Sequence, residues 1–159
     1  MIGFGYDSHR FERGNYIVVG GLKIDCEYSL VAHSDGDALV HSIIDALLGA
    51  AALGDIGEHF PDNDPRFAGI DSTVLLKRII DLISEINLEI VNIDASIVLE
   101  KPKLNYFKTK IKKNLASICK IAENQINIKA KSNEKMGFIG RSEGIACYAV
   151  CQLKKKESV

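Results

Sequence analysis

The 159-residue sequence predicts a single-domain α+β sandwich, in which a mixed β-sheet carries helices packed on one face. Strand-like and helix-like segments alternate along the chain, and strand pairs stand at both ends. No internal repeat or low-complexity linker divides the sequence. The expected order is two strands, two helices, a strand, a helix and two strands. Residues 154–159, which begin with three lysines, are expected to form a solvated C-terminal tail.

The first segments predict strands. Residues 2–8 alternate between large apolar side chains and small or polar ones, so the two faces of this strand differ. The second face carries Gly3, Gly5, Asp7 and His9, and the glycines keep it free of bulk. Residues 16–19 predict a second strand, and residues 22–24 a short extended piece.

A buried helix is expected next. Ser34 and Asp37 fit an S-x-x-D capping box that would start it. Residues 38–53 are apolar nearly all round, which indicates burial on every side, and Gly54 would end the helix. Residues 54–70 then form a polar loop, and a loop of this length within a compact domain is usually functional or mobile.

The second half repeats the alternation. Ser72 is expected to cap a second helix, whose apolar residues between Leu75 and Ile86 follow the 3.6-residue period. The remaining elements are a strand at 91–99, a helix beginning near Lys103, a strand at 126–130, a polar loop at 131–144 and a last strand at 145–153.

Composition narrows the classes of function. The net charge is −1, from 20 basic and 21 acidic residues, which argues against a general nucleic-acid binder. The N-terminus lacks the features of a secretory signal, and no apolar run reaches the roughly 18 residues of a membrane span. The four cysteines form no C-x-x-C pair, which favours reduced thiols. We therefore expect a cytoplasmic protein whose partners include neither nucleic acid nor membrane.

Asp7, His9 and His41 are candidate metal ligands. Asp7 and His9 lie on one side of a strand and can converge on one ion, although taken alone they are better explained as a hydrogen-bonded surface pair. His41 stands in an apolar helix with Asp37 and Asp45 one turn away on either side. It is either a core histidine bonded to one of these carboxylates or a ligand that one of them orients. One Asp and two His suit Zn²⁺ and leave a fourth position open for substrate.

Two further groups suit phosphate. His33 and Ser34 stand at the expected helix N-terminus, where free N–H groups and the helix dipole favour an anion. The alternative is that His33 is an ordinary loop residue. Ser132, Asn133 and Glu134 offer hydroxyl, amide and carboxylate groups, which suit a phosphate with its own Mg²⁺. Taken singly, these are also ordinary loop residues.

The combination resembles the 2-C-methyl-D-erythritol 2,4-cyclodiphosphate synthase family of the non-mevalonate isoprenoid pathway. Six ordered blocks along the whole chain carry the resemblance. They are G-x-D-S-H-R-F from Gly5, A-H-S-D-G-D-A from Ala32, D-A-L-L-G-A-A-A-L-G-D-I-G from Asp45, F-P-D-N-D-P from Phe60, P-K-L from Pro102 and N-E-K-M-G-F-I-G-R-S-E-G-I-A from Asn133.

This resemblance implies a homotrimer whose active sites lie between neighbouring subunits. It implies Zn²⁺ on the three candidate ligands, Mg²⁺ or Mn²⁺ on Glu134, and transition-state contacts from His33 and Ser132. Phe138 and Arg141 would line a cavity on the trimer axis that can accept an isoprenoid diphosphate. The other residues that it implies for substrate binding are Ser34, Asp55, Ile56, Gly57, Phe60, Pro61, Asp62, Asn63, Asp64, Leu99, Glu100, Lys101, Pro102, Lys103, Leu104, Asn105, Ala130, Lys131 and Asn133.

The implied substrate is 4-diphosphocytidyl-2-C-methyl-D-erythritol 2-phosphate, whose 2-phosphate attacks the nearer phosphorus of the diphosphate and releases CMP. A phosphate nucleophile is largely ionised at neutral pH, so no strong general base is required. A zinc phosphohydrolase with metal-bound water, and a non-enzymatic module with a structural metal, are the alternatives. Lys131 and Leu99 depart from the residues common in the family at these positions, and Ser132 keeps a hydroxyl.

Overall fold

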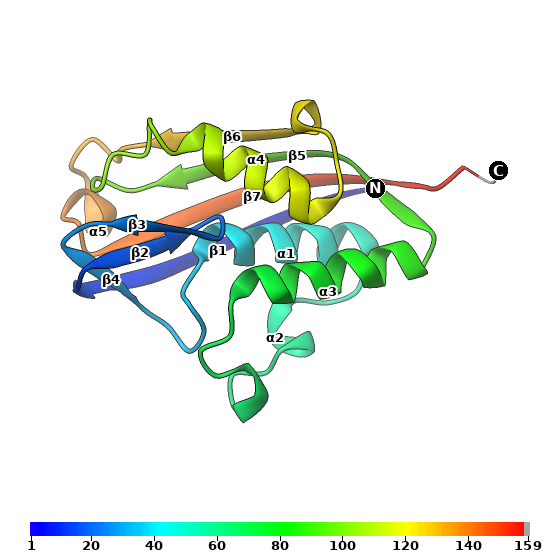
Figure 1. Cartoon of the computed structure of the whole chain (residues 1–159), viewed down its shortest axis with the longest axis horizontal. Coiled ribbons are helices and arrows are strands. Elements are labelled where there is room, and N and C mark those ends of the chain that lie inside the picture. The colour runs from blue at the N-terminus through cyan, green and yellow to red at the C-terminus, as the bar shows by residue number, and fades with distance from the viewer. Residues whose placement is uncertain (158–159) are drawn as a thin grey trace.

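A five-stranded mixed sheet organises the computed structural model, which describes residues 1–157 (Figure 1). The strands lie in the order β4-β1-β7-β5-β6. Only β5 and β6 run parallel; the other neighbours are antiparallel. Their bounds are β1 Ile2–Arg13, β4 Tyr28–Val31, β5 Leu88–Val98, β6 Ile126–Lys131 and β7 Gly144–Lys155. The mixed sheet and the α+β class are as the sequence predicts.

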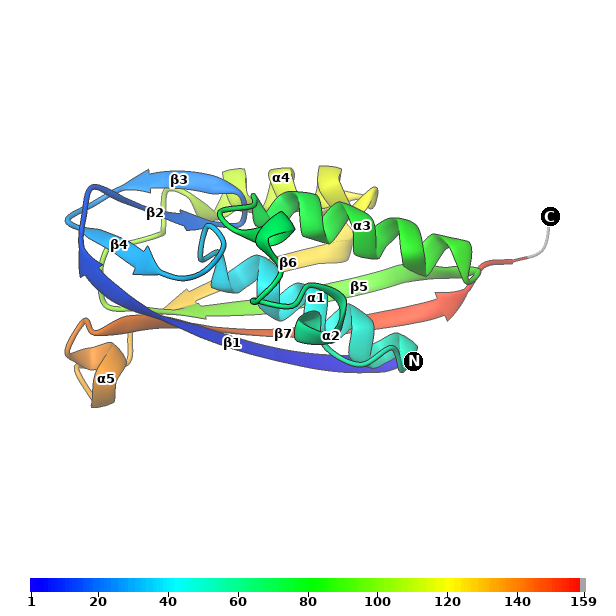
Figure 2. The same ribbon diagram turned by 90° about the horizontal axis from the view of Figure 1, so that it is seen from below.

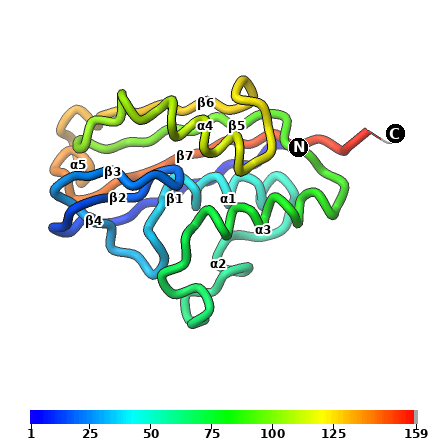
Figure 3. Tube along the Cα trace, viewed as in Figure 1, coloured from blue at the N-terminus to red at the C-terminus, as the bar shows by residue number. Residues whose placement is uncertain are grey.

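The three long helices pack on one face of this sheet (Figure 2). They are α1 Ala38–Ala51, α3 Ser72–Glu85 and α4 Lys108–Cys119. Strands β2 (Tyr16–Val19) and β3 (Leu22–Asp25) were expected in this sheet but form a separate one, since within residues 1–157 they pair with each other alone. Two short helices, α2 (Ile56–His59) and α5 (Gly137–Gly140), lie in the segments predicted as polar loops. The trace in Figure 3 shows the excursion of the chain that follows α1, contains α2 and leads into α3.

Helix α1 is the centre of the core and lies directly against β1. A Cβ atom on Gly3 would overlap with the carbonyl oxygen of Ala46, and one on Gly5 would overlap with that of Ser42. The two glycines therefore allow the helix backbone to approach the strand. This close packing sets the distance between the candidate ligands Asp7 on β1 and His41 on α1.

The opposite face of the sheet remains apolar but exposed. Phe4 and Tyr6 on β1 expose 62% and 44% of their surface, and Tyr148 and Val150 on β7 expose 39% and 43%. The rings of Tyr6 and Tyr148 lie 5.1 Å apart between centroids. A contiguous exposed apolar surface of this kind is typical of a contact with another protein.

The N-terminus of α1 differs from the prediction. Asp37, not Ser34, is the N-cap, and its carboxylate accepts hydrogen bonds from the N–H groups of Val40, Gly20 and Gly21 at 3.1, 2.9 and 2.6 Å. Burial raises the pKa of Asp37, and the three amide donors oppose that rise. The capping box was wrong because a carboxylate bound to the β2–β3 turn outcompetes the serine for this position.

Other element ends also shift. Ala52, in the left-handed region, ends α1 two residues before Gly54. Asp71, not Ser72, caps α3, since its carboxylate accepts from the N–H of Thr73. Helix α4 begins at Lys108 rather than near Lys103, because a turn bonded from the N–H of Phe107 to the carbonyl oxygen of Leu104 precedes it. No strand was predicted at Tyr28–Val31, where the structure has the short strand β4.

The expected tail begins later than residue 154. Lys154 and Lys155 are the last residues of β7, and the ammonium of Lys154 lies 3.0 Å from the carboxylate of Glu89. Residues 158–159 of that tail lie outside the described part of the chain. Within residues 1–157, every helix is too short or too polar to cross a membrane.

Candidate active site

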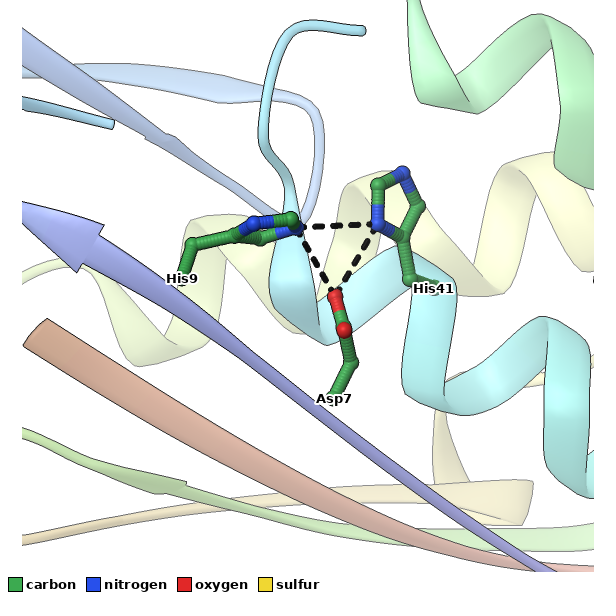
Figure 4. Close-up of side chains that lie close together, drawn as sticks. All are labelled: Asp7, His9 and His41. Carbon is green, nitrogen blue, oxygen red and sulfur yellow. Dashed lines mark hydrogen bonds and ion pairs between the residues drawn. The ribbon is translucent and has the colours of Figure 1, made fainter. Parts of the chain in front are cut away.

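Asp7, His9 and His41 converge on one point, as the sequence predicts (Figure 4). Asp7 Oδ2 lies 2.9 Å from His9 Nε2 and 3.0 Å from His41 Nδ1. The two imidazole nitrogens lie 3.2 Å apart. These three atoms form a nearly equilateral triangle at the junction of β1 and α1.

The local structure explains this convergence. Asp7 and His9 are two residues apart on β1, so both point to the helix side of the sheet. His41 stands in the first turn of α1, and the glycines of β1 bring that helix close. Residues 34 positions apart in the sequence, Asp7 and His41, are thereby placed within hydrogen-bond distance.

The donor set fits a zinc ion. Atoms bound to one tetrahedral Zn²⁺ at about 2.0–2.2 Å lie about 3.3–3.6 Å from one another, so the triangle needs to open by only a few tenths of an ångström. Two imidazole nitrogens and a carboxylate oxygen that all face the same point are also the ligands zinc prefers. The observation favours a ligand role for His41 over the alternative of a core histidine.

The charges of the three groups support one another. Burial would raise the pKa of Asp7, but hydrogen bonds to His41 and His9 outweigh it and lower that pKa to about 2. Burial would lower the pKa of His41, but the hydrogen bond and charge of Asp7 raise it above its ordinary value. A bound cation would take the place of the proton on His41 in stabilising the Asp7 carboxylate.

The second nitrogen of His41 has different partners from those expected. Nε2 lies 2.8 Å from the hydroxyl of Ser72 and 3.3 Å from that of Ser34. Asp37 is occupied by backbone N–H groups, and Asp45 accepts from the N–H of Ile56 at 2.8 Å. Neither carboxylate orients His41, so this part of the prediction was wrong. Ser72 was missed because a serine before a helix was interpreted as its cap.

The triad opens into a pocket of about 200 Å³. Six of the predicted substrate and catalytic residues line it: His33, Ser34, Ile56, Gly57, Phe60 and Asp62. Phe67, Ile70 and Leu75 also line it, and nothing in the sequence marked these apolar residues as functional. Asp55, Pro61, Asn63 and Asp64 lie in the same excursion but outside the lining; Asp55 and Asp64 cap α2 and a 3₁₀ turn at Pro65–Phe67.

His33 is an exposed residue in the bend before α1. Its carbonyl oxygen accepts from the N–H of Gly69 at 2.8 Å, which ties this bend to the end of the α2 excursion. Because the carboxylate of Asp37 caps α1, the helix N-terminus expected to hold phosphate beside His33 already has an anionic group. His33 therefore lines the pocket, but the N-terminus of α1 is not free to bind a phosphate beside it.

The remaining predicted residues form a second group away from this pocket. Glu100 Oε1 accepts from the N–H groups of Asn133 and Lys135 at 2.9 and 3.0 Å, so the 99–105 segment and the 131–138 loop are joined. Ser132 donates to Glu134 Oε1 at 3.1 Å. Glu134 and Lys135 both have positive φ angles, 50° and 62°. Such strained backbone is common at functional sites.

Side chains in this second group differ in what they can offer a ligand. Leu99 and Leu104 are buried, so only their backbone is available to a ligand. Lys101, Lys103, Asn105 and Lys131 are exposed, and Pro102 and Ala130 are half-buried. Phe138 and Arg141 lie at α5, where Arg141 pairs with Glu143 at 2.7 Å. Among the described residues, the lining of the triad pocket includes no member of this group.

Comparison with known proteins agrees with this geometry. The model of the YgbB family matches residues 1–154. The 2-C-methyl-D-erythritol 2,4-cyclodiphosphate synthase of Azotobacter vinelandii is 49% identical over 152 residues, which are 96% of this chain and 97% of that protein. The chain belongs to the cyclodiphosphate synthase (YgbB) family.

Two further relatives place the chain within this family. The bifunctional enzyme IspD/IspF of Aliarcobacter butzleri is 50% identical over 96% of this chain, which spans only 41% of that longer protein. The Plasmodium falciparum IspF structure, a CDP complex, has a TM-score of 0.86 and 36% identity and covers 98% of this chain and 96% of its own. The synthase therefore occurs both as a separate protein and as part of a larger one.

Proposed function

We infer that the chain is a 2-C-methyl-D-erythritol 2,4-cyclodiphosphate synthase, a phosphorus–oxygen lyase of isoprenoid precursor biosynthesis. The observation that carries this is the Asp7–His9–His41 triangle in a pocket, in a chain about half identical to named synthases over nearly its full length. The substrate is 4-diphosphocytidyl-2-C-methyl-D-erythritol 2-phosphate. An oxygen of its 2-phosphate forms a bond to the diphosphate phosphorus that is nearest the erythritol. The bond from that phosphorus to CMP breaks.

We propose that Asp7 Oδ2, His9 Nε2 and His41 Nδ1 hold Zn²⁺, which when bound supplies positive charge to a phosphate oxygen. The pocket residues orient the substrate around that position. Ile56, Gly57 and Phe60 offer an apolar wall for the methylerythritol carbons, and Asp62 an acceptor for its hydroxyls. His33 at the rim can donate to a phosphate oxygen in the transition state. Positioning and charge stabilisation are what phosphoryl transfer requires.

The second group is proposed to hold the nucleotide. Glu134 would bind Mg²⁺ or Mn²⁺ on the diphosphate, and the Ser132 hydroxyl, now donated to Glu134, would turn to a phosphate oxygen. The backbone of the 99–105 segment would contact cytidine. The related P. falciparum structure is a CDP complex, which supports a cytidine nucleotide as ligand.

A direct assay tests the function. The purified protein with Zn²⁺ and Mg²⁺ is incubated with the diphosphocytidyl substrate, and the products are followed by phosphorus NMR. We expect CMP and a cyclic diphosphate in equal amounts. Release of linear phosphates would instead support the zinc phosphohydrolase, in which water takes the place of the 2-phosphate as nucleophile.

We also propose a homotrimer with active sites shared between subunits. The two groups of predicted residues are separate within one chain, and each alone lacks part of the chemistry. The exposed apolar face of the sheet, with Phe4, Tyr6, Tyr148 and Val150, offers the surface for association. Free thiols at all four cysteines support a cytoplasmic location.

Phe138 and Arg141 are proposed to line a cavity on the trimer axis that takes an isoprenoid diphosphate. Phe138 is exposed, and the guanidinium of Arg141 is free to leave Glu143 for a diphosphate, because the existing pair is exposed and weak. Binding of an isoprenoid diphosphate should weaken in Arg141→Ala, and equal binding by the two proteins would exclude this role.

A further inference from the structure

We propose that Asp35 and Ser72 form a positioning relay, which holds the His41 ring with its Nε2 protonated and so presents Nδ1 as the metal-binding atom. The inference rests on the zinc site proposed above. Neither residue belongs to the triad, and both were outside the site predicted from the sequence. The relay is built from a buried hydroxyl and a carboxylate on the far side of the ring from Asp7.

The proton on Ser72 has a fixed direction. The hydroxyl of Ser72 donates to Asp35 Oδ1 in a very short hydrogen bond, and the N–H of the same residue donates to Asp35 Oδ2 at 3.0 Å. A carboxylate has no proton to give, so the hydroxyl hydrogen must point toward Asp35. Ser72 is fully buried, which leaves no water to compete for that hydrogen.

The direction of that proton decides the state of His41. His41 Nε2 lies 2.8 Å from Ser72 Oγ. Since the Ser72 hydroxyl already donates its hydrogen bond to Asp35, its oxygen can only accept a hydrogen bond from His41. Nε2 must therefore be the donor. A neutral imidazole that carries its proton on Nε2 has a lone pair on Nδ1, the atom that faces Asp7 and His9.

Asp35 is itself held firmly. Its Oδ1 also accepts from the N–H of Asp37 at 3.1 Å, and its own N–H donates to the carbonyl oxygen of Ile70 at 3.3 Å. The carboxylate thus joins the bend before α1 to the start of α3. The relay fixes the His41 ring from two separate elements, which is how the outer partners of metal ligands keep a site in its binding geometry.

Zinc affinity tests the relay independently of activity. We expect Ser72→Ala to raise the zinc dissociation constant about 10–100-fold, as loss of such an outer partner does, in a competition titration with a chromophoric chelator. Thr73→Ala is the matched control. It removes a hydroxyl one residue later in the same helical turn, where Thr73 donates to Asp71 at 2.6 Å and does not contact His41. Equal affinities of the two variants would overturn the relay.

A double-mutant cycle tests the order of the two residues. Asp35→Ala frees the Ser72 hydroxyl to point at Nε2, so zinc binding should weaken in this variant too. Once the hydroxyl is absent, Asp35 has no route to the ring, and the double variant should bind zinc no more weakly than Ser72→Ala. Fully additive losses would show that Asp35 acts by another route. Melting of the zinc-free variants identifies any general loss of folding.

Proton NMR of the zinc-loaded wild-type protein adds a readout that needs no variant to fold. The His41 Nε2 proton should give a resonance that exchanges slowly with water, because Ser72 holds it in the interior. Rapid exchange would contradict the relay. Failure of the zinc site itself looks different: His41→Ala would then bind zinc as the wild type does, whereas failure of the relay alone leaves His41→Ala defective and Ser72→Ala normal.

Discussion

His41 Nδ1 and Asp7 Oδ2 lie 3.0 Å apart, although the two residues stand on different elements that only the packing of α1 on β1 brings together. Asp7 on the strand and His41 in the first turn of the helix are thus joined at the point where the two elements cross. The geometry of the site is therefore as precise as this helix–strand contact.

His41→Ala should abolish both zinc binding and synthase activity while the assembly state is retained, because one of three ligands is lost and the other two are on β1. Zinc per subunit after gel filtration is the measurement. His59→Ala is the control: its Nε2 lies 2.8 Å from the carbonyl oxygen of Leu53, outside the pocket lining. Normal zinc content in His41→Ala would contradict the ligand assignment.

Zinc should stabilise the protein more as pH rises. The pKa of His41 is raised by Asp7, so in the metal-free protein their interaction stabilises the fold below the ordinary histidine pKa and is lost as pH rises through the raised one. Zinc must displace that proton. The increase in Tm on adding zinc should therefore grow as pH rises from below the ordinary histidine pKa through the raised pKa of His41.

The Asp7 carboxylate does not contribute to this trend. Its pKa of about 2 keeps it ionised throughout the range, so its own stabilising effect is lost only in much stronger acid. His41→Ala is the control for the zinc effect, and it should show no pH-dependent increase in Tm. A constant increase in the wild-type protein would exclude His41 as the group that competes with the metal.

Shared active sites predict recovery of activity in mixed assemblies. Glu134→Gln and His41→Ala each disable one half of the site and should be inactive alone. When differently tagged copies are co-expressed and the mixed oligomer is isolated, sites that combine an intact half from each copy should work. In every mixed cyclic trimer, about one third of the sites (one of the three) combine the two intact halves. No activity in the mixed oligomer would indicate that each subunit carries a whole site.

The sequence predicted the triad better than its surroundings. Alternation on β1 placed Asp7 and His9 on one side, and an imidazole stood out in an apolar helix, so all three candidate ligands could be named from local patterns. Partners across long loops could not. Ser72 reaches His41 only because the chain returns after the α2 excursion, and Asp37 is taken by the β2–β3 turn rather than by the ring. Neither contact can be inferred from the local periodicity of the sequence.

The ends of helices and strands were likewise harder to predict from local patterns than the elements themselves. The apolar run of α1 predicted a buried helix, and the helix is buried. Its cap depended on Gly20 and Gly21, which are 16 or more residues away. The alternation of the first strand places Gly3 and Gly5 on the same side as Asp7. Only the packed structure shows that glycine is needed there because the backbone of α1 lies so close.

Gly5→Ala should therefore separate the ligands without touching any of them. A Cβ here would overlap with the backbone oxygen of Ser42, next to His41, and the helix backbone has no rotamer by which to move away. We expect a loss of about 1–3 kcal/mol in the free energy of unfolding from overpacking, with zinc affinity reduced as α1 shifts from β1. Denaturant unfolding and the chelator titration measure the two effects.

Gly49→Ala, on helix α1, is the matched control. A Cβ at Gly49 would lie 3.9 Å from the carbonyl oxygen of Phe4, an ordinary contact. Alanine is also the better residue within a helix, so this variant should gain about 0.5–1 kcal/mol in the free energy of unfolding and bind zinc normally. If Gly5→Ala were as stable as Gly49→Ala and kept its zinc, the close approach of α1 to β1 could not be what sets the distance between Asp7 and His41.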